Sequence, residues 1–224
     1  MGSKVLLITM NLQTIAQMSC NPAMGGIAKG QIVREIDAMG GYSGIVSDKS
    51  LIQFRMLNKS KGPAMWSPRT QNDRMLFSST WREILKKNKN IDFYQDTVKS
   101  LIIEKNRVAG VITNMGHHIK SKAVIITSGT FLNGIIHIGD KNFAGGRVAE
   151  KASHGITEQL VSLGFQSDRL KTGTPPRVDG RSLDYSKMDI QYGDSDISGF
   201  SYLPIKKIKA EDQKCCYITY TSEK

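Results

Sequence analysis

The chain has 224 residues, 39% hydrophobic and 23% charged, which is the composition of an ordinary globular protein. No apolar run reaches the roughly 20 residues needed to cross a membrane. A formal net charge of +11 favours polyanionic partners, and nucleic acid is one such class. The three cysteines, two of them adjacent, form neither a disulfide framework nor a zinc spacing. This favours a reducing, cytoplasmic setting, and we predict no metal site.

The first predicted element is a strand over residues 5–9 (VLLIT), a short apolar run typical of a buried parallel strand. Dinucleotide-binding folds normally begin with an earlier strand, a Gly-rich turn and a helix, and none of these precedes residue 5. The carboxylate that often binds a ribose after the second strand is also missing. We therefore expect the chain to be an internal fragment of a longer protein.

Residues 18–41 (MSCNPAMGGIAKGQIVREIDAMGG) are the most informative stretch. They predict a Gly-rich loop that leads into a helix whose apolar face carries Ile32, Val33, Ile36 and Met39. Gly40-Gly41 is the predicted stop of this helix. A helix start suits an anion and favours the reactive thiolate form of a cysteine, which here would be Cys20. A Gly-rich turn with a buried, inert cysteine explains the same residues.

The middle of the chain predicts a helix followed by β structure. Ser67-Pro68 resembles a helix N-cap with proline at the first position. The helix is expected over residues 69–87, and its predicted core residues are Met75, Leu76, Trp81, Ile84 and Leu85. Residues 92–127 predict a three-stranded meander that leads into a buried strand over 123–127.

The strand over 123–127 is followed by Ser128, Gly129 and Thr130. A small residue and a glycine at a strand end allow a backbone to approach a cofactor closely. Residues 139–147 are expected to form a loop and residues 152–163 a helix. Beyond it, RLKTGTPPR places Arg169, Lys171 and Arg177 around a rigid Pro-Pro turn, which suits a phosphate-rich partner, although a crossover between domains explains the same residues.

Several strings together resemble one family, the tRNA uridine 5-carboxymethylaminomethyl modification enzymes, also called the MnmG or GidA family. They are MSCNPAMGGIAKG, KGPAMWSPRTQNDR, VIITSGTFLNGIIHIG, GGR and RLKTGTPPR, in that order along nearly the whole chain. The resemblance implies an α/β fold. Residues 1–170 would be part of an FAD-binding, Rossmann-like domain of the glutathione-reductase type with a β-meander, lacking its first strand and Gly-rich turn. Residues 171–224 would begin an inserted second domain.

The resemblance also implies an FAD-dependent enzyme that adds a (carboxymethyl)aminomethyl group at carbon five of the wobble uridine of tRNA. Such enzymes use NADH and methylene-tetrahydrofolate, form homodimers and work with an MnmE-type GTPase. Cys20 matches the first of two cysteines implicated in activity, and Val98 and Ser153 match FAD-contacting positions. We add Ser128, Gly129 and Thr130 as cofactor contacts from the strand-end argument, and Arg169, Lys171 and Arg177 as contacts to tRNA phosphates.

Three alternatives remain open at this stage. A folate- and FAD-dependent tRNA uridine methyltransferase is one, although the Cys20 signature argues against it. A general FAD oxidoreductase of small molecules and a non-catalytic RNA-binding domain are the others. If the fragment interpretation holds, residues 1–224 expressed alone should be poorly soluble or partly unfolded, inactive and colourless, because the turn that binds the FAD pyrophosphate would be missing.

Overall fold

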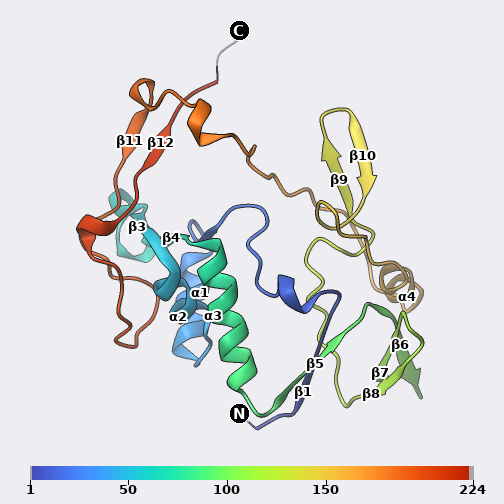
Figure 1. Cartoon of the computed structure of the whole chain (residues 1–224). Helices are drawn as coiled ribbons and strands as arrows, with labels where there is room; N and C mark the ends of the chain where they lie inside the picture. The colour runs from blue at the N-terminus through green and yellow to red at the C-terminus, as the bar shows by residue number, and fades with distance from the viewer. Residues whose placement is uncertain (1, 222–224) are drawn as a thin grey trace. The chain divides into compact units, whose positions relative to one another are not determined.

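The structure is a computed structural model that describes residues 2–221 (Figure 1). The described chain forms two compact units, each built from two separate stretches of sequence. Unit 1 takes in the described residues up to Ile15 together with Asn88–Thr172. Unit 2 takes in Ala16–Lys87 together with the described residues from Gly173 onward. Both units contain helices and sheets, so the predicted α/β class is confirmed. The predicted division at residue 170 concerns domains of a longer protein and stays a prediction.

Unit 1 begins with the predicted strand. β1 (Val5–Thr9) pairs in parallel with β5 (Ile91–Gln95), in register from Val5 opposite Ile91 to Thr9 opposite Gln95. The strand and its parallel pairing are confirmed, but the expected burial is wrong, because Val5 is 48% exposed. A ribbon of two strands has too little surface to bury either face by itself.

The predicted meander is confirmed. β6 (Val98–Glu104), β7 (Arg107–Thr113) and β8 (His118–Lys120) pair antiparallel in that order. Lys105 and Asn106 connect the first two strands with φ angles of 48° and 60°, as a tight two-residue hairpin requires.

The expected buried strand over residues 123–127 is wrong. These residues form no strand, and Ile125 is 86% exposed. An apolar run becomes a strand only when a neighbour supplies ladder hydrogen bonds, and no described residue pairs with this run.

The expected loop over 139–147 is also wrong in part, because β9 (Ile135–Ile138) and β10 (Lys141–Ala144) form an antiparallel hairpin. Gly139 allows the tight turn through its φ of 55°. The predicted helix is confirmed but shorter, as α4 (Ile156–Ser162). The Gln159 side chain ties α4 to β6, because it accepts from the Leu101 N–H at 2.6 Å and donates to the Leu101 carbonyl at 2.9 Å.

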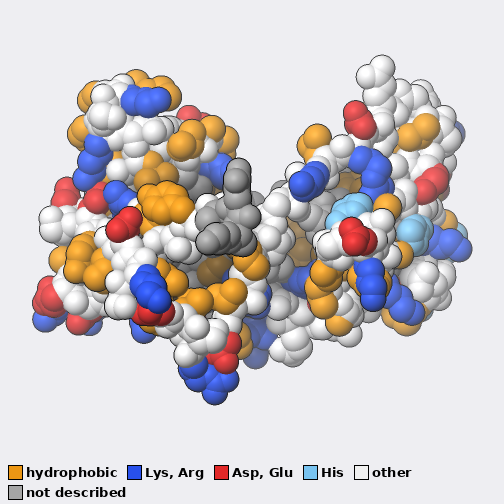
Figure 2. Space-filling view, turned by 90° about the horizontal axis from the view of Figure 1, so that it is seen from above, with side chains coloured by type: hydrophobic (Ala, Val, Ile, Leu, Met, Phe, Trp, Pro, Cys, Tyr) orange, Lys and Arg blue, Asp and Glu red, His pale blue; other side chains and the backbone are white. Residues whose placement is uncertain are grey.

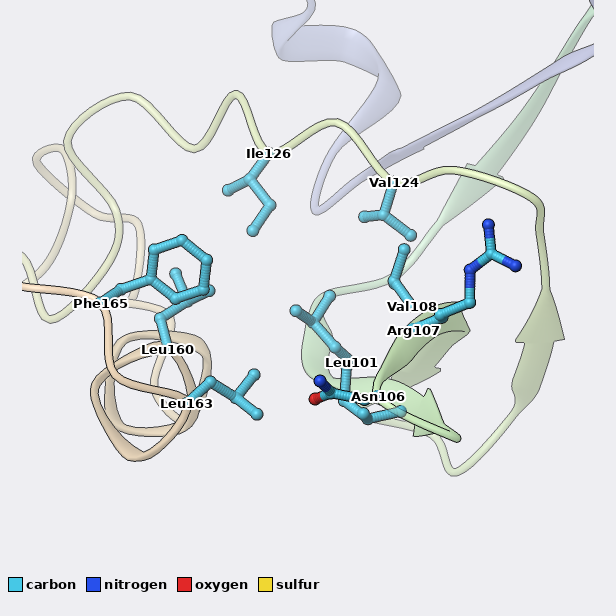
Figure 3. Close-up of a pocket in the computed structure, with 10 residues that line it drawn as sticks. Leu101, Asn106, Arg107, Val108, Val124, Ile126, Leu160, Leu163 and Phe165 are labelled. Carbon is cyan, nitrogen blue, oxygen red and sulfur yellow. The ribbon is translucent and has the colours of Figure 1, made fainter.

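Unit 1 has little buried apolar core. Among its described residues, Val111 and Ile156 are the hydrophobic side chains that are more than nine-tenths buried. Apolar side chains from the meander, α4 and the segment around residue 125 face a hollow of about 460 Å³ instead (Figure 3). The residues that line it are Leu101, Ile103, Asn106, Arg107, Val108, Val124, Ile126, Leu160, Leu163 and Phe165.

Unit 2 is built on an antiparallel sheet with β4 in the centre. β4 (Ser67–Asn72) lies between β2 (Ala23–Gly25) and β3 (Leu51–Leu57). A second pair, β11 (Asp189–Gln191) and β12 (Cys216–Ile218), is also antiparallel. The helices are α1 (Gly30–Ala38), α2 (Ser43–Ser50) and α3 (Arg74–Lys87). The buried hydrophobic core consists of Val33, Val46, Leu51, Phe54, Phe77 and Phe200.

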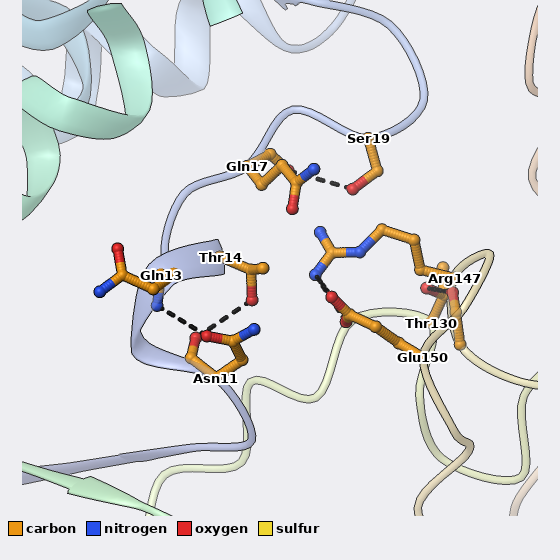
Figure 4. Close-up of polar contacts among 9 residues, drawn as sticks. Asn11, Gln13, Thr14, Gln17, Ser19, Thr130, Arg147 and Glu150 are labelled. Carbon is orange, nitrogen blue, oxygen red and sulfur yellow. Dashed lines mark hydrogen bonds and ion pairs between the residues drawn. The ribbon is translucent and has the colours of Figure 1, made fainter. Parts of the chain in front are cut away.

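Short 3-10 turns occur in both units. Leu12–Thr14 follows β1, and the Asn11 side chain caps it by accepting from the Gln13 N–H at 2.8 Å (Figure 4). The remaining turns are Lys59–Lys61, Pro63–Met65, Gly180–Ser182, Tyr185–Lys187 and Ala210–Asp212.

The helix predicted after the Gly-rich loop is α1, and its stop is confirmed. The Gly40 N–H bonds to the Asp37 carbonyl and the Gly41 N–H to the Ile36 carbonyl, both at 2.8 Å, which closes a Schellman motif. The predicted apolar face is wrong. Among the described residues Val33 is buried, but the buried face also holds Gly30 and Asp37. The three others, Ile32, Ile36 and Met39, are exposed.

The predicted helix start at Ser67-Pro68 is wrong, because these residues begin β4. α3 starts at Arg74, and the Asp73 carboxylate caps it by accepting from the N–H groups of the second and third helical residues at 2.9 Å. Of the predicted core residues, Met75 and Leu76 are exposed, while Trp81, Ile84 and Leu85 are half-buried. Phe77, which the prediction omitted, is buried on the helix, which packs against α2.

Candidate functional site

Cys20 lies in unit 2, in an irregular segment directly ahead of β2, where it is half-buried with a free thiol. The Arg177 side chain lies against the same segment. Its Nη2 donates to the carbonyl oxygens of Ser19 at 3.1 Å and of Cys20 at 2.7 Å. Two residues for which the sequence predicts separate roles are therefore in contact.

The glycines after Cys20 serve close packing. A Cβ at Gly25 would lie 2.3 Å from the Pro68 carbonyl and 2.5 Å from the Phe200 ring, and Gly25 has a φ of +80°. A Cβ at Gly30 would lie 2.6 Å from the same Pro68 oxygen. The predicted Gly-rich segment does lead into α1, but the short strand β2 lies between Cys20 and the helix. Packing against β4 explains these two glycines without an anion.

Two buried carboxylates anchor a later segment to the helices of unit 2. Asp48 is 1% exposed and accepts from the Phe200 N–H at 2.9 Å and the Ser201 N–H at 2.9 Å. Asp37 accepts from the Tyr202 N–H at 2.8 Å. Burial raises the pKa of Asp48 above its ordinary value, and it outweighs the backbone N–H groups of Ser201 and Phe200, which lower it.

Sequence reasoning missed these two acids. The only signal for Asp37 is its spacing from Gly30 and Val33, which places an acid on the buried stripe of the helix.

In unit 1 the structure brings together most of the predicted cofactor-contact residues. The Ser153 hydroxyl donates to the Val98 carbonyl at 3.5 Å, and the Ser153 N–H donates to the Phe131 carbonyl at 2.8 Å. Ser153 thus connects the start of β6 to the turn that follows Ser128, Gly129 and Thr130. The Thr130 hydroxyl donates to the Gly146 carbonyl at 2.6 Å, which ties this turn to the next loop.

A polar network lies beside this turn. The Asn133 amide donates to Glu158 at 2.7 Å, and its oxygen contacts His154 Nδ1 at 2.7 Å. Arg169 Nη1 donates to the Asn133 carbonyl at 3.0 Å. The Glu158 pKa lies below its ordinary value because of backbone N–H groups, foremost its own, and the Asn133 amide.

The neighbouring loop is held by an ion pair. Arg147 and Glu150 lie 2.6 Å apart, as the dashed line in Figure 4 marks, and the Arg147 guanidinium lies 5.7 Å from the centre of the Phe131 ring. Because Arg147 is engaged by Glu150 and Phe131, it stiffens the turn next to Thr130.

The predicted basic turn crosses from one unit to the other. Arg169 and Lys171 belong to unit 1 and Arg177 to unit 2, and residues 169–177 are exposed without regular structure. Both arginines donate to a backbone carbonyl of their own unit. Figure 2 shows Lys and Arg side chains spread over the visible face among acidic and hydrophobic ones.

Residues 2–221 hold neither a membrane-spanning helix nor a metal-binding cluster. No helix there has the length and apolar character to span a bilayer. No group of three His, Cys, Asp or Glu residues within that range is arranged to hold a metal ion.

Comparison with known proteins gives a consistent result. Residues 1–224 match the family model described as glucose inhibited division protein A. The chain is 64% identical over 222 residues to the tRNA uridine 5-carboxymethylaminomethyl modification enzyme MnmG of Flavobacterium johnsoniae, covering 99% of this chain and 36% of that protein. It is 65% identical over 223 residues to the MnmG of Cytophaga hutchinsonii, again covering 36% of the relative.

A solved structure shares the fold. GidA from Aquifex aeolicus in its form I crystal superposes with a TM-score of 0.88 at 43% identity, covering 95% of this chain and 36% of that one. The chain thus spans about a third of the length of the relatives that it matches.

Proposed function

The chain belongs to the glucose inhibited division protein A family, and we propose on this premise that a longer protein containing it modifies tRNA. The proposed reaction adds a (carboxymethyl)aminomethyl group at carbon five of the wobble uridine. One observation carries the proposal: 64% identity along 99% of the chain to an enzyme named for this modification. The net charge of +11 supports a polyanionic substrate.

We infer that FAD is the cofactor and that unit 1 contributes to its site. The residues present fit such a group at the turn after residue 127, because Gly129 has a φ of +58° and the space that a Cβ would enter is open. Val98, Ser153, Ser128, Gly129 and Thr130 would contact it. When bound, FAD would supply the redox chemistry, with NADH as reductant and methylene-tetrahydrofolate as the one-carbon donor.

The protein's own groups have separate proposed tasks. The Cys20 thiol would take part in the chemistry. Arg169 and Lys171 would contact tRNA phosphates without reading bases, and Arg177 is a third candidate for that contact. A homodimer that works with an MnmE-type GTPase in the cytoplasm completes the proposal.

The test uses the full-length protein, tRNA and the partner GTPase, and it measures modified uridine by nucleoside mass spectrometry. Cys20→Ser should abolish the modification and keep the visible flavin absorbance, while Cys215→Ser serves as the matched control and should retain both. A yellow protein that oxidises NADH equally well with and without tRNA, and leaves uridine unmodified, would support a general FAD oxidoreductase instead. A colourless protein that binds RNA would support the non-catalytic alternative.

A further inference from the structure

The Cys20 segment of unit 2 has no helix or strand of its own to define its geometry. The backbone therefore depends on individual contacts at this point. On the C-terminal side, the Asn72 N–H donates to the Pro22 carbonyl at 2.7 Å, and β2 then pairs with β4. On the Cys20 side, the contact comes from Arg177, more than 150 residues later in the chain.

The position of this contact matters for the thiol. The carbonyl of Ser19 belongs to the peptide plane before the Cys20 Cα, and the carbonyl of Cys20 belongs to the plane after it. The orientation of these two planes defines φ and ψ of Cys20, and hence the direction in which its Cβ leaves the backbone. One nitrogen, Nη2 of Arg177, donates to both oxygens, at 3.1 Å and 2.7 Å.

The guanidinium of Arg177 is not drawn away by the acid nearest to it in sequence. Asp179 is paired with Arg181 at 2.7 Å, so its carboxylate is already engaged. The segment that carries Arg177 is also anchored downstream in the same unit, because Phe200 is fully buried and its N–H is held by Asp48. The Arg177 guanidinium is therefore free to hold the Ser19 and Cys20 carbonyls through charge-assisted hydrogen bonds, which are directional.

We propose that Arg177 is a positioning residue that orients the Cys20 side chain by holding the two peptide planes beside it. The proposal rests on the proposed role of Cys20 in tRNA modification, and it assigns Arg177 a task in the absence of tRNA. Arg177 acts through Cys20 and does not itself touch the reacting atoms. A phosphate-binding role alone would require no contact with Cys20 before tRNA arrives.

The experiment measures the alkylation rate of Cys20 by iodoacetamide in the full-length protein without tRNA, with Cys215 as an internal reference. Arg177→Gln should raise the Cys20 rate at least about tenfold, because the half-buried Cys20 segment loses both hydrogen bonds from Arg177 and its thiol becomes more accessible; one hydrogen bond from a charged donor corresponds to about a factor of ten. The Cys215 rate should not change. Lys206→Gln removes one positive charge from an exposed site of the same unit and leaves the Asp179–Arg181 pair intact, so it is the matched control, with no expected change in either rate.

Arg177→Lys separates geometry from charge. An ammonium keeps the charge but lacks the planar fork, so its Cys20 rate should lie between those of the parent and Arg177→Gln. In the modification assay, Arg177→Gln should lower kcat and leave the KM for tRNA unchanged.

The outcomes are distinguishable. An unchanged Cys20 rate in Arg177→Gln overturns the positioning role, and a raised KM for tRNA with that result identifies Arg177 as a phosphate contact. A changed Cys20 rate with undiminished modification supports the positioning role and overturns the proposed chemistry of Cys20. Unfolding curves of each variant confirm that the compared proteins are folded.

Discussion

The two units of the molecule differ in what holds them together. Unit 2 has a core of buried apolar side chains, and buried hydrogen bonds such as that from Thr70 to Asn72 at 2.8 Å lie within it. In unit 1, apolar side chains line an open hollow, and some of them stay largely exposed, as Phe165 does at 62%. The meander and α4 of unit 1 therefore form as regular elements although their apolar faces stay partly uncovered.

The difference in core burial arises from contacts between segments that are far apart in the sequence. In unit 2, residues near position 200 pack between the strands and helices of residues 16–87, as Phe200 does against Gly25. In unit 1, α4 is tied to β6 by polar contacts, those of Gln159 with Leu101, and few apolar side chains are buried. We therefore expect unit 1 to open at lower free energy than unit 2.

The largest expected effect comes from emptying the core of unit 2. Phe200→Ala should lower the free energy of unfolding of unit 2 by about 3–5 kcal/mol. Phe165→Ala, its matched control in unit 1, removes a side chain that is 62% exposed and should cost less than about 1 kcal/mol. Both tryptophans, Trp66 and Trp81, lie in unit 2, so their fluorescence during urea unfolding reports Phe200→Ala, and amide hydrogen exchange of unit 1 reports Phe165→Ala. Equal losses from both variants would contradict the contrast between the units.

Replacing a glycine by alanine in each unit, at Gly25 and at Gly129, should give the next largest difference in destabilisation. Gly25→Ala should destabilise unit 2 by about 2–4 kcal/mol, because the added Cβ meets Pro68 and Phe200 and the residue has positive φ. Gly129→Ala in unit 1 has the positive φ but open space, so about 1 kcal/mol of backbone strain is expected. Tryptophan fluorescence reports the first variant, and amide hydrogen exchange of the 128–134 peptide the second. A Gly25→Ala protein as stable as the parent would argue against the close approach.

Within unit 1, Gln159→Ala should loosen α4 from β6. Losing the two hydrogen bonds to Leu101 should cost about 1–2 kcal/mol, seen as faster amide exchange in residues 98–104 and 156–162. Ser162→Ala on the same helix removes one exposed hydroxyl contact and should leave the exchange nearly unchanged. Tryptophan fluorescence should not register either change, because the tryptophans belong to the other unit.

The smallest effect is a dependence on pH in unit 2. The folded-state pKa of Asp48 is raised above 3.8 by burial, so the folded protein binds this proton more tightly than the unfolded chain does. This contribution to stability is present at low pH and is lost as the pH rises from 3.8 through the raised pKa. Asp48→Asn removes it, so the stability difference between Asp48→Asn and the parent should shift in favour of the variant over that interval. A difference that is constant with pH would contradict a raised pKa.

The sequence predicted much of the local structure because the signals are local. The alternation of apolar runs and turns predicts the meander, and the helical spacing that ends at Gly40-Gly41 predicts α1 with its C-terminal motif. The motif strings predict the family. Local patterns were wrong where two explanations compete: Ser67-Pro68 fits a helix start, but pairing with strands on both sides makes it the beginning of the central strand β4.

The α/β class, the order of most elements, the family and the interest of Cys20 follow from local patterns in the sequence. The buried faces do not: Asp37 is inside while Ile32 and Met39 are outside, because the faces that pack depend on neighbours distant in the chain. The contact of Arg177 with the Cys20 backbone is likewise visible only in the tertiary structure. The two residues are 157 positions apart, and a hydrogen bond over that separation produces no pattern in a single sequence.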